Sequence, residues 1–151
     1  MSIYNALNIS ASGMSAQRLR MDLISQNIAN VNTTRTDNGE PYRRQTVVFA
    51  QQESGSFGRL LNQASSVRKN SEFNGTGVKV TSVVEDHVTA MKEVYDPSHP
   101  DADENGYVTY PNVNTVTEMT NLIDATRSYE ANITAFNATK SMLLKGLEVG
   151  K

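Results

Sequence analysis

The sequence has no cysteine, no tryptophan and only two histidines among its 151 residues. Without cysteine the chain can form no disulfide, no thiolate zinc site and no thiol nucleophile. A serine hydrolase needs a histidine base, but neither His87 nor His99 accompanies a nucleophile motif such as G-x-S-x-G. No ligand spacing around these histidines indicates a metal site. We therefore expect a protein that is not an enzyme and that uses no cofactor and no small-molecule substrate.

Charged and hydrophobic residues are also sparse. The formal net charge is -2 and the basic residues are spread along the chain, so the basic patch of a nucleic-acid-binding protein is missing. Only 38% of the residues are hydrophobic, which gives a thin core for one compact domain and predicts a surface that partners complete. No stretch suits a membrane span or a cleaved secretory signal peptide, which on its own favours a cytosolic protein.

One acidic stretch resembles the first half of an EF-hand calcium loop. Its alternating oxygen ligands would be Asp101, Asp103 and Asn105. The twelfth position, where an EF-hand needs a bidentate Glu, is Asn112, and Pro97 and Pro100 oppose the helix that should enter the loop. Aspartate, asparagine, glycine and proline are also turn residues, so a structured turn is the favoured interpretation. A calcium-binding module remains the alternative.

The first thirty or so residues have the apolar spacing of a helix. Large apolar side chains recur every seven residues, at Leu7, Met14, Met21 and Ile28. The stripe is imperfect, because Ser10 and Gln17 occupy seam positions and Gly13 costs a helix about 1 kcal/mol relative to alanine. The run "ANVNTT" is expected to end this helix, because asparagine and threonine compete for backbone hydrogen bonds.

The far end of the chain repeats this pattern from about 114 to 147. One heptad line carries Leu122, Tyr129, Phe136 and Leu143. We expect the two helices to pair as a coiled-coil-like hairpin, because each stripe is too narrow to be stable alone in water. A hairpin that only supports the middle of the chain would explain these stripes, whereas the alanine-rich outer faces would also admit further helices.

The middle of the chain has the composition of strands and turns. Gln45–Ala50 and Gly77–Asp86 are rich in valine and threonine and are predicted strands, with a glycine- and serine-rich flexible arm at about 51–76 between them. The predicted fold class is therefore mainly α with a small β region. Its expected parts are an N-terminal helix over 1–32, a β-rich middle domain over 33–112 and a C-terminal helix over 113–151.

Three stretches together resemble the family of bacterial flagellar rod, hook and other axial proteins. "SQNIANVNT" (Ser25–Thr33), followed by "YRRQ" (Tyr42–Gln45), is similar to the amino-terminal signature of that family. "VYDPSHPDADENGYVTYPNVN" (Val94–Asn114), leading into the C-terminal helix, is similar to its proximal-rod members. The positions that match these signatures are Asn27, Ala29, Asn30, Asn32, Thr33, Asp96, Pro97, His99, Pro100, Gly106, Tyr107, Pro111 and Asn112.

The resemblance implies a structural protein without catalytic activity. Members of the family assemble into a hollow rod across the periplasm, a drive shaft that transmits torque, with paired terminal helices as its inner tube. They reach it through the flagellar type III export apparatus without a cleaved signal peptide. The implied partners are other rod proteins, further copies of the chain and that apparatus, and the implied location is the flagellar basal body. Asn27, Asn30, Asn32 and Thr33 would form a bonded corner between the first helix and the middle domain.

Overall fold

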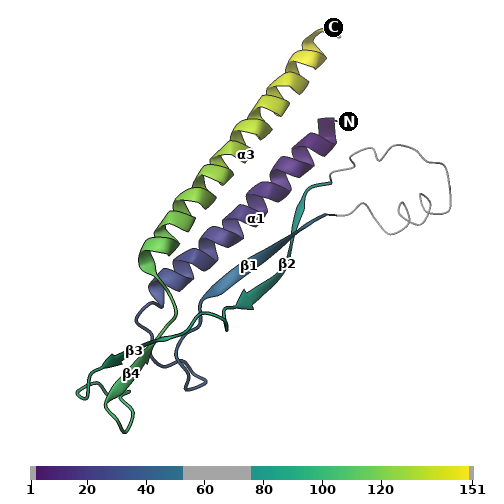
Figure 1. Cartoon of the computed structure of the whole chain (residues 1–151). Coiled ribbons are helices and arrows are strands. Elements are labelled where there is room, and N and C mark those ends of the chain that lie inside the picture. Colours follow the sequence, from purple (N-terminus) through teal and green to yellow (C-terminus); the bar gives the residue numbers. More distant parts are fainter. Residues whose placement is uncertain (1–2, 53–75, 150–151) are drawn as a thin grey trace, which may run out of the picture.

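A computed structural model describes residues 3–52 and 76–149 of the chain. Two long helices lie side by side and antiparallel, with a small β region against one of them and at one end of the pair (Figure 1). The predicted class, mainly α with a small β region, is confirmed. The elements are α1 (Ile3–Ala29), β1 (Gln45–Gln51), β2 (Val78–Glu85), β3 (Lys92–Tyr95), β4 (Tyr107–Tyr110) and α3 (Thr115–Val149).

Helix α1 has 27 residues and ends where asparagine and threonine take over its last hydrogen bonds. The Asn30 side chain donates to the carbonyl of Gln26 at 2.9 Å, and Thr33 donates its hydroxyl to the Asn30 side chain at 3.1 Å. These bonds satisfy groups that the end of a helix leaves without partners. The chain then turns toward β1, as the sequence predicts.

Helix α3 has 35 residues and begins at an asparagine cap. The Asn114 side chain accepts hydrogen bonds from the amides of Val116 at 3.0 Å and Thr117 at 3.2 Å. Such a cap contributes about 1 kcal/mol to helix stability. Among the described residues, neither helix is long and apolar enough to cross a membrane.

Small residues bring the two helices close together. Ala16 and Ala125 are buried where the helices meet, with 4% and 0% of their surfaces exposed. A Cβ added to Gly13 would lie 2.9 Å from the Asn132 side-chain oxygen, which leaves no room for a larger residue. Leu23 and Ile24 complete the apolar core of α1 next to the β region.

Strands β1 and β2 form an antiparallel ribbon that runs along α1 (Figure 1). Val47 pairs with Val83, and a register shift between Val48 and Phe49 marks a bulge. Both strands were predicted. Strand β1 is one residue longer at its end than predicted, and β2 is one residue shorter at both ends. Of the predicted arm at about 51–76, residues 53–75 lie outside the part that the structure describes. The predicted domain boundaries remain predictions.

Strands β3 and β4 form a second antiparallel pair, in the register Val94 opposite Val108. The sequence favours a structured turn over this stretch and predicts neither strand, so the hairpin is a correction. Each strand has only four residues and is bordered by turn residues, which hides its alternation in the sequence. Val108 is fully buried and anchors the hairpin.

Candidate functional site: a buried polar corner and a half-covered helix pair

The structure places all eight predicted seam residues at half-buried positions along the helix pair. The hydroxyl of Thr126 on α3 reaches the sulfur of Met21 at 3.5 Å, so this residue of the α1 stripe contacts α3. The most deeply buried apolar residues of the helices are instead Ala16 and Ala125, with Ile24 and Leu23 next to the β region. The large side chains therefore flank the line of closest approach. The seam residues are Leu7, Met14, Met21, Ile28, Leu122, Tyr129, Phe136 and Leu143.

Other large apolar side chains of α3 are exposed. Val116, Met119 and Ile123 are 74%, 54% and 54% exposed, and their spacing of three and four residues places them on one helix face. Nearer the carboxyl end, Met142, Leu144 and Leu147 are also more than half exposed, and this end of α3 extends beyond the start of α1 in Figure 1. We call these six residues the exposed α3 surface.

A cluster of polar side chains lies where α1, α3 and β1 meet. We call this cluster, made of Asn27, Tyr42, Arg44, Asn112 and Glu118, the polar corner. Asn27 is 1% exposed, yet all four of its hydrogen-bonding positions are used. Its oxygen accepts from the Tyr42 hydroxyl and the Gln45 amide, each at 2.9 Å. Its nitrogen donates to the Gln45 carbonyl at 2.9 Å and to Glu118 at 3.0 Å.

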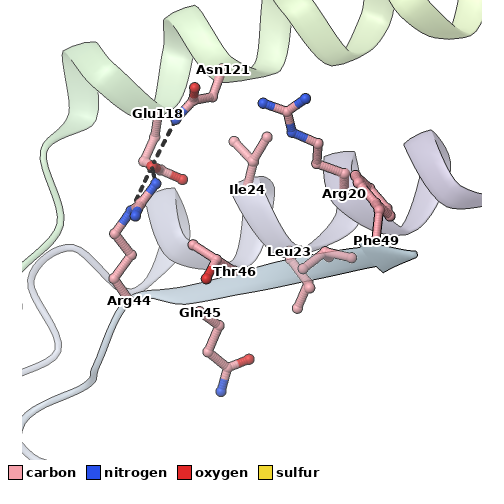
Figure 2. Close-up of a pocket in the computed structure, with 10 residues that line it drawn as sticks. Arg20, Leu23, Ile24, Arg44, Gln45, Thr46, Phe49, Glu118 and Asn121 are labelled. Carbon is pink, nitrogen blue, oxygen red and sulfur yellow. Dashed lines mark hydrogen bonds and ion pairs between the residues drawn. The ribbon is translucent and has the colours of Figure 1, made fainter. Parts of the chain in front are cut away.

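Glu118, in the first turn of α3, is also 1% exposed. One carboxylate oxygen accepts from Arg44 at Nε, 2.9 Å, and at Nη2, 2.8 Å, while the other accepts from Asn27. The Asn121 side chain adds a longer contact of 3.3 Å (Figure 2). A buried carboxylate is tolerated only when it is paired and hydrogen-bonded, and here both conditions are met.

Asn112 ties the β region to the corner. Its oxygen accepts from the Arg44 amide at 2.9 Å, and its nitrogen donates to the carbonyls of Asp86, at 2.8 Å, and Thr89, at 3.2 Å. The Asp86 amide in turn donates to the Arg44 carbonyl at 2.8 Å. Where the ladder of β1 and β2 ends, the Asn112 side chain therefore makes hydrogen bonds to backbone groups that a neighbouring strand would otherwise make.

The surroundings shift the pKa of Tyr42 in the polar corner and of Asp86 beside it. Burial raises the pKa of the Tyr42 hydroxyl, and the nearby charges of Glu85 and Glu118 raise it further. Hydrogen bonds from Thr89 and then from the Val88 amide lower the pKa of the Asp86 carboxyl, and the Arg44 guanidinium adds to that effect. Tyr42 therefore stays a neutral donor to Asn27 and Asp86 stays charged over the physiological range.

A groove of about 290 Å³ lies beside the corner, between α1, β1 and α3 (Figure 2). Arg20, Phe49 and Asn121 line it together with the Glu118–Arg44 pair. Arg20 projects from α1 toward α3 (Figure 2). The lining contains no histidine, serine or cysteine that could act as a base or nucleophile.

The acidic stretch of the calcium alternative forms turns. One Asp103 oxygen accepts from the amides of Asn105, at 2.9 Å, and Tyr107, at 2.8 Å, and Asp101 accepts from the Thr34 hydroxyl at 2.8 Å. Gly106 has a φ of +80°, as such a turn needs. No group of three His, Cys, Asp or Glu residues suited to a metal occurs in the described part of the chain. The calcium alternative is not supported.

The matched family positions fall into two places in the fold. Asn27, Ala29, Asn30, Asn32 and Thr33 lie at the end of α1, where Asn27, Asn30 and Thr33 make the bonds described above while Ala29 and Asn32 are exposed. The others lie on the β3–β4 hairpin or between it and α3, where Pro111 and Asn112 are buried. These others are Asp96, Pro97, His99, Pro100, Gly106, Tyr107, Pro111 and Asn112.

Sequence reasoning missed the Glu118–Arg44 pair. The two residues are 74 positions apart, and no local pattern connects them. The available signal was the arginine pair of "YRRQ" together with an acid in the first turn of a helix whose neighbours are neutral.

An extended helix pair with a small β region, a buried polar corner and exposed apolar side chains describes a structural subunit. Comparisons with known proteins agree with this class. The family model described as "Flagella basal body rod protein" matches residues 7–35, and the one described as "Flagellar basal body rod FlgEFG protein C-terminal" matches residues 104–149.

Full-length relatives identify the family more closely. The chain is 50% identical to the flagellar basal-body rod protein FlgC of Bacillus subtilis, with 100% of both chains covered. It is 42% identical to that of Borreliella burgdorferi, over 99% of this chain and 98% of the relative, and 40% identical to that of Salmonella typhimurium, over 100% of both. The chain belongs to the FlgC family of flagellar basal-body rod proteins. It is a structural component of the flagellar basal-body rod and not an enzyme.

Proposed function

We propose that the chain is a proximal-rod subunit that joins other rod proteins and copies of itself through its terminal helices. The assembly is a hollow drive shaft across the periplasm that transmits torque in flagellar motility. The observation that carries this proposal is the exposed α3 surface, because apolar side chains of this size are normally covered in a finished assembly. The relatives are rod proteins, and the rod is where these side chains would find cover.

The energy available from covering this surface is large. Fully burying one large apolar side chain contributes about 1.5–3 kcal/mol, and each of these six is already partly covered. Burial of half of each side chain would still give several kcal/mol per subunit before the entropy cost of association. That is enough to order helix ends that make few contacts within one chain.

Export fits the same proposal. A subunit whose helix ends gain most of their burial from neighbours can pass unfolded through the flagellar type III export apparatus and fold as it assembles. This route would require no cleaved signal peptide. Far-UV circular dichroism with light scattering should show the free subunit monomeric and less helical than the 27 and 35 residues of α1 and α3.

A charge placed on the exposed α3 surface tests the proposal. Ile123→Lys is expected to leave the unfolding free energy of the free chain within about 0.5 kcal/mol, because the side chain is 54% exposed. In a bacterium that lacks its own copy, the variant should be exported but should leave cells non-motile and without complete rods by electron microscopy.

Two further variants complete this test. Thr117→Lys, also exposed on α3, is the matched control and should restore motility. Deletion of residues 137–151 should leave a soluble chain that does not assemble. Full motility with Ile123→Lys and with the deletion would refute assembly through α3.

A further inference from the structure

We propose that the Asn27–Glu118–Arg44 part of the polar corner is a register lock, which fixes how far α3 is shifted along α1 and thereby positions the assembly surface. Only the claim that the lock positions the assembly surface rests on the proposed function. The lock itself is a property of the single chain. Its three side chains come from α1, α3 and the residue before β1, so one cluster sets the relative position of three elements.

The rest of the helix interface specifies register weakly. The large seam residues recur every seven positions on both helices and are all half-buried, and the apolar residues that are buried in the helices are few, namely Ala16, Leu23, Ile24 and Ala125. A shift of one heptad moves α3 by about 10 Å and again places apolar residues opposite apolar residues. Small and repetitive contacts of this kind permit several registers of similar stability.

The polar corner removes that freedom, because its hydrogen bonds are saturated in one register only. The Asn27 nitrogen points two donors at fixed acceptors, the Gln45 carbonyl and Glu118. Both oxygens of Glu118 act as acceptors, since Asn27 donates to one of them and Arg44 donates to the other. A heptad shift would leave a carboxylate and an amide that are both 1% exposed without these partners. One buried polar position that selects a register is an established use of such residues.

The lock acts at one end of the helix pair. The buried apolar residues of the helices, Ala16, Leu23, Ile24 and Ala125, lie between the polar corner and the middle of the helices, while the buried Ser10 lies farther along α1. The exposed residues Met142, Leu144 and Leu147 lie at the opposite end of α3. The corner half is therefore held in register within the free chain, and the distal half is what neighbouring subunits would complete.

The chain has no cysteine, so engineered disulfides can report the register without background. The native pair is Gly13→Cys with Asn132→Cys. A Cβ at Gly13 would lie 3.1 Å from the Asn132 Cγ, and the sulfur of a cysteine at residue 132 would occupy that γ position, which is compatible with a disulfide. The pair shifted by one heptad is Gly13→Cys with Thr139→Cys, combined with Asn132→Ala to remove the same side chain. Both pairs are made in the purified full-length chain and oxidised under identical conditions.

With an intact corner, the disulfide of the native pair should form at least about tenfold faster than that of the shifted pair. The shifted register would break the hydrogen bonds among Asn27, Glu118 and Arg44 and is therefore rarely populated. In Glu118→Leu, which removes the buried charge and keeps an apolar volume, the two rates should come within about threefold of each other. Thr117→Leu, on the exposed side of the same turn, is the matched control and should keep the tenfold preference.

Two outcomes overturn the proposal. One is a similar rate for both pairs with the corner intact, which includes the case in which neither pair forms. The other is an unchanged preference in Glu118→Leu and in the double variant Asn27→Leu/Glu118→Leu. Circular dichroism on each variant shows whether the helices are still present, and a variant that has lost its helices is replaced by Arg44→Met. Because disulfides are measured in the free chain, this result is independent of whether Ile123→Lys blocks rod assembly.

Discussion

The replacement Asn27→Asp is the sharpest perturbation of the polar corner, because it exchanges one nitrogen for one oxygen. The oxygen side of residue 27 can still accept from the Tyr42 hydroxyl and the Gln45 amide. The Asn27 nitrogen now donates to Glu118 at 3.0 Å and to the Gln45 carbonyl at 2.9 Å. In the variant a carboxylate oxygen of residue 27 would face these two acceptors instead.

The magnitude follows from these distances. Two unit charges 3 Å apart repel by on the order of 5 kcal/mol at an effective dielectric constant of about 20. Arg44 offsets part of this, since it already pairs with Glu118 at 2.8 Å. The loss of two donated hydrogen bonds adds about 1–3 kcal/mol. We expect a net destabilisation of about 3–5 kcal/mol near neutral pH, which is a large share of the stability of a small protein.

The variant should also become more stable as the pH falls below 7. Two carboxylates that share a buried site take up one proton with a raised pKa, so the folded variant binds more protons than the unfolded chain. Its stability should therefore rise as the pH falls from 7 toward 5, and part of the loss should be recovered because a shared proton restores one donated bond.

Urea unfolding of both proteins, followed by circular dichroism at 222 nm between pH 5 and 7.5, measures the two effects. Asn30→Asp is the matched control, because the Asn30 side chain lies at the helix end, where it bonds the exposed carbonyl of Gln26 and the Thr33 hydroxyl and no charged group. It should cost about 1 kcal/mol or less, with little pH dependence. The reasoning is wrong if Asn27→Asp costs no more than the control, or if acidification destabilises it further.

Two other predictions concern the turns. Gly106→Ala should destabilise the chain more than Gly39→Ala in urea unfolding, by about 1–2 kcal/mol against about 1 kcal/mol, because both glycines have a φ of +80° but only a Cβ at Gly106 meets a neighbour, a tyrosine ring carbon at 3.0 Å. Equal losses would contradict this. The Ser98 hydroxyl and then its amide lower the pKa of Asp96 below 3.8, so this group contributes stability that is present above pH 3.8 and is lost as the pH falls through the lowered pKa. Ser98→Ala should raise the Asp96 pKa back toward 3.8 in an NMR titration, and an unchanged titration curve would refute the assignment.

The long helices could be predicted because their signals are local. A seven-residue apolar repeat lies within each segment, Asn30 bonds the end of α1, and Asn114 caps the start of α3. Which side of each helix is buried could not be predicted in the same way. Large side chains dominate the pattern, whereas Ala16 and Ala125 decide how closely the backbones approach. Close approach moves the centre of the contact away from the large residues.

The polar corner could be predicted only in part. Asn27 and Asn112 were selected from the family signature, and asparagine near a helix end is expected to bond the backbone. Their partner Glu118 was not identified, because the sequence around a buried acid does not differ from that around an exposed one when its partner is distant in the chain. Arg44 is brought to Glu118 by the return of the chain from α1 into β1. This contact depends on the tertiary structure and has no local sequence signal.

The distribution of polarity in this chain is the reverse of that in a self-sufficient domain. A buried acid, a buried asparagine and an arginine occupy the junction of three elements, while six large apolar side chains of one helix face outward. Buried polar groups specify one arrangement because their bonds are directional, whereas apolar contacts bind without specifying much. The corner is therefore suited to set the shape of the subunit before assembly, and the exposed α3 surface to supply the energy of assembly. If the two tasks are separate in this way, Glu118→Leu should disturb register in the free chain, and Ile123→Lys should block the rod while leaving that register intact.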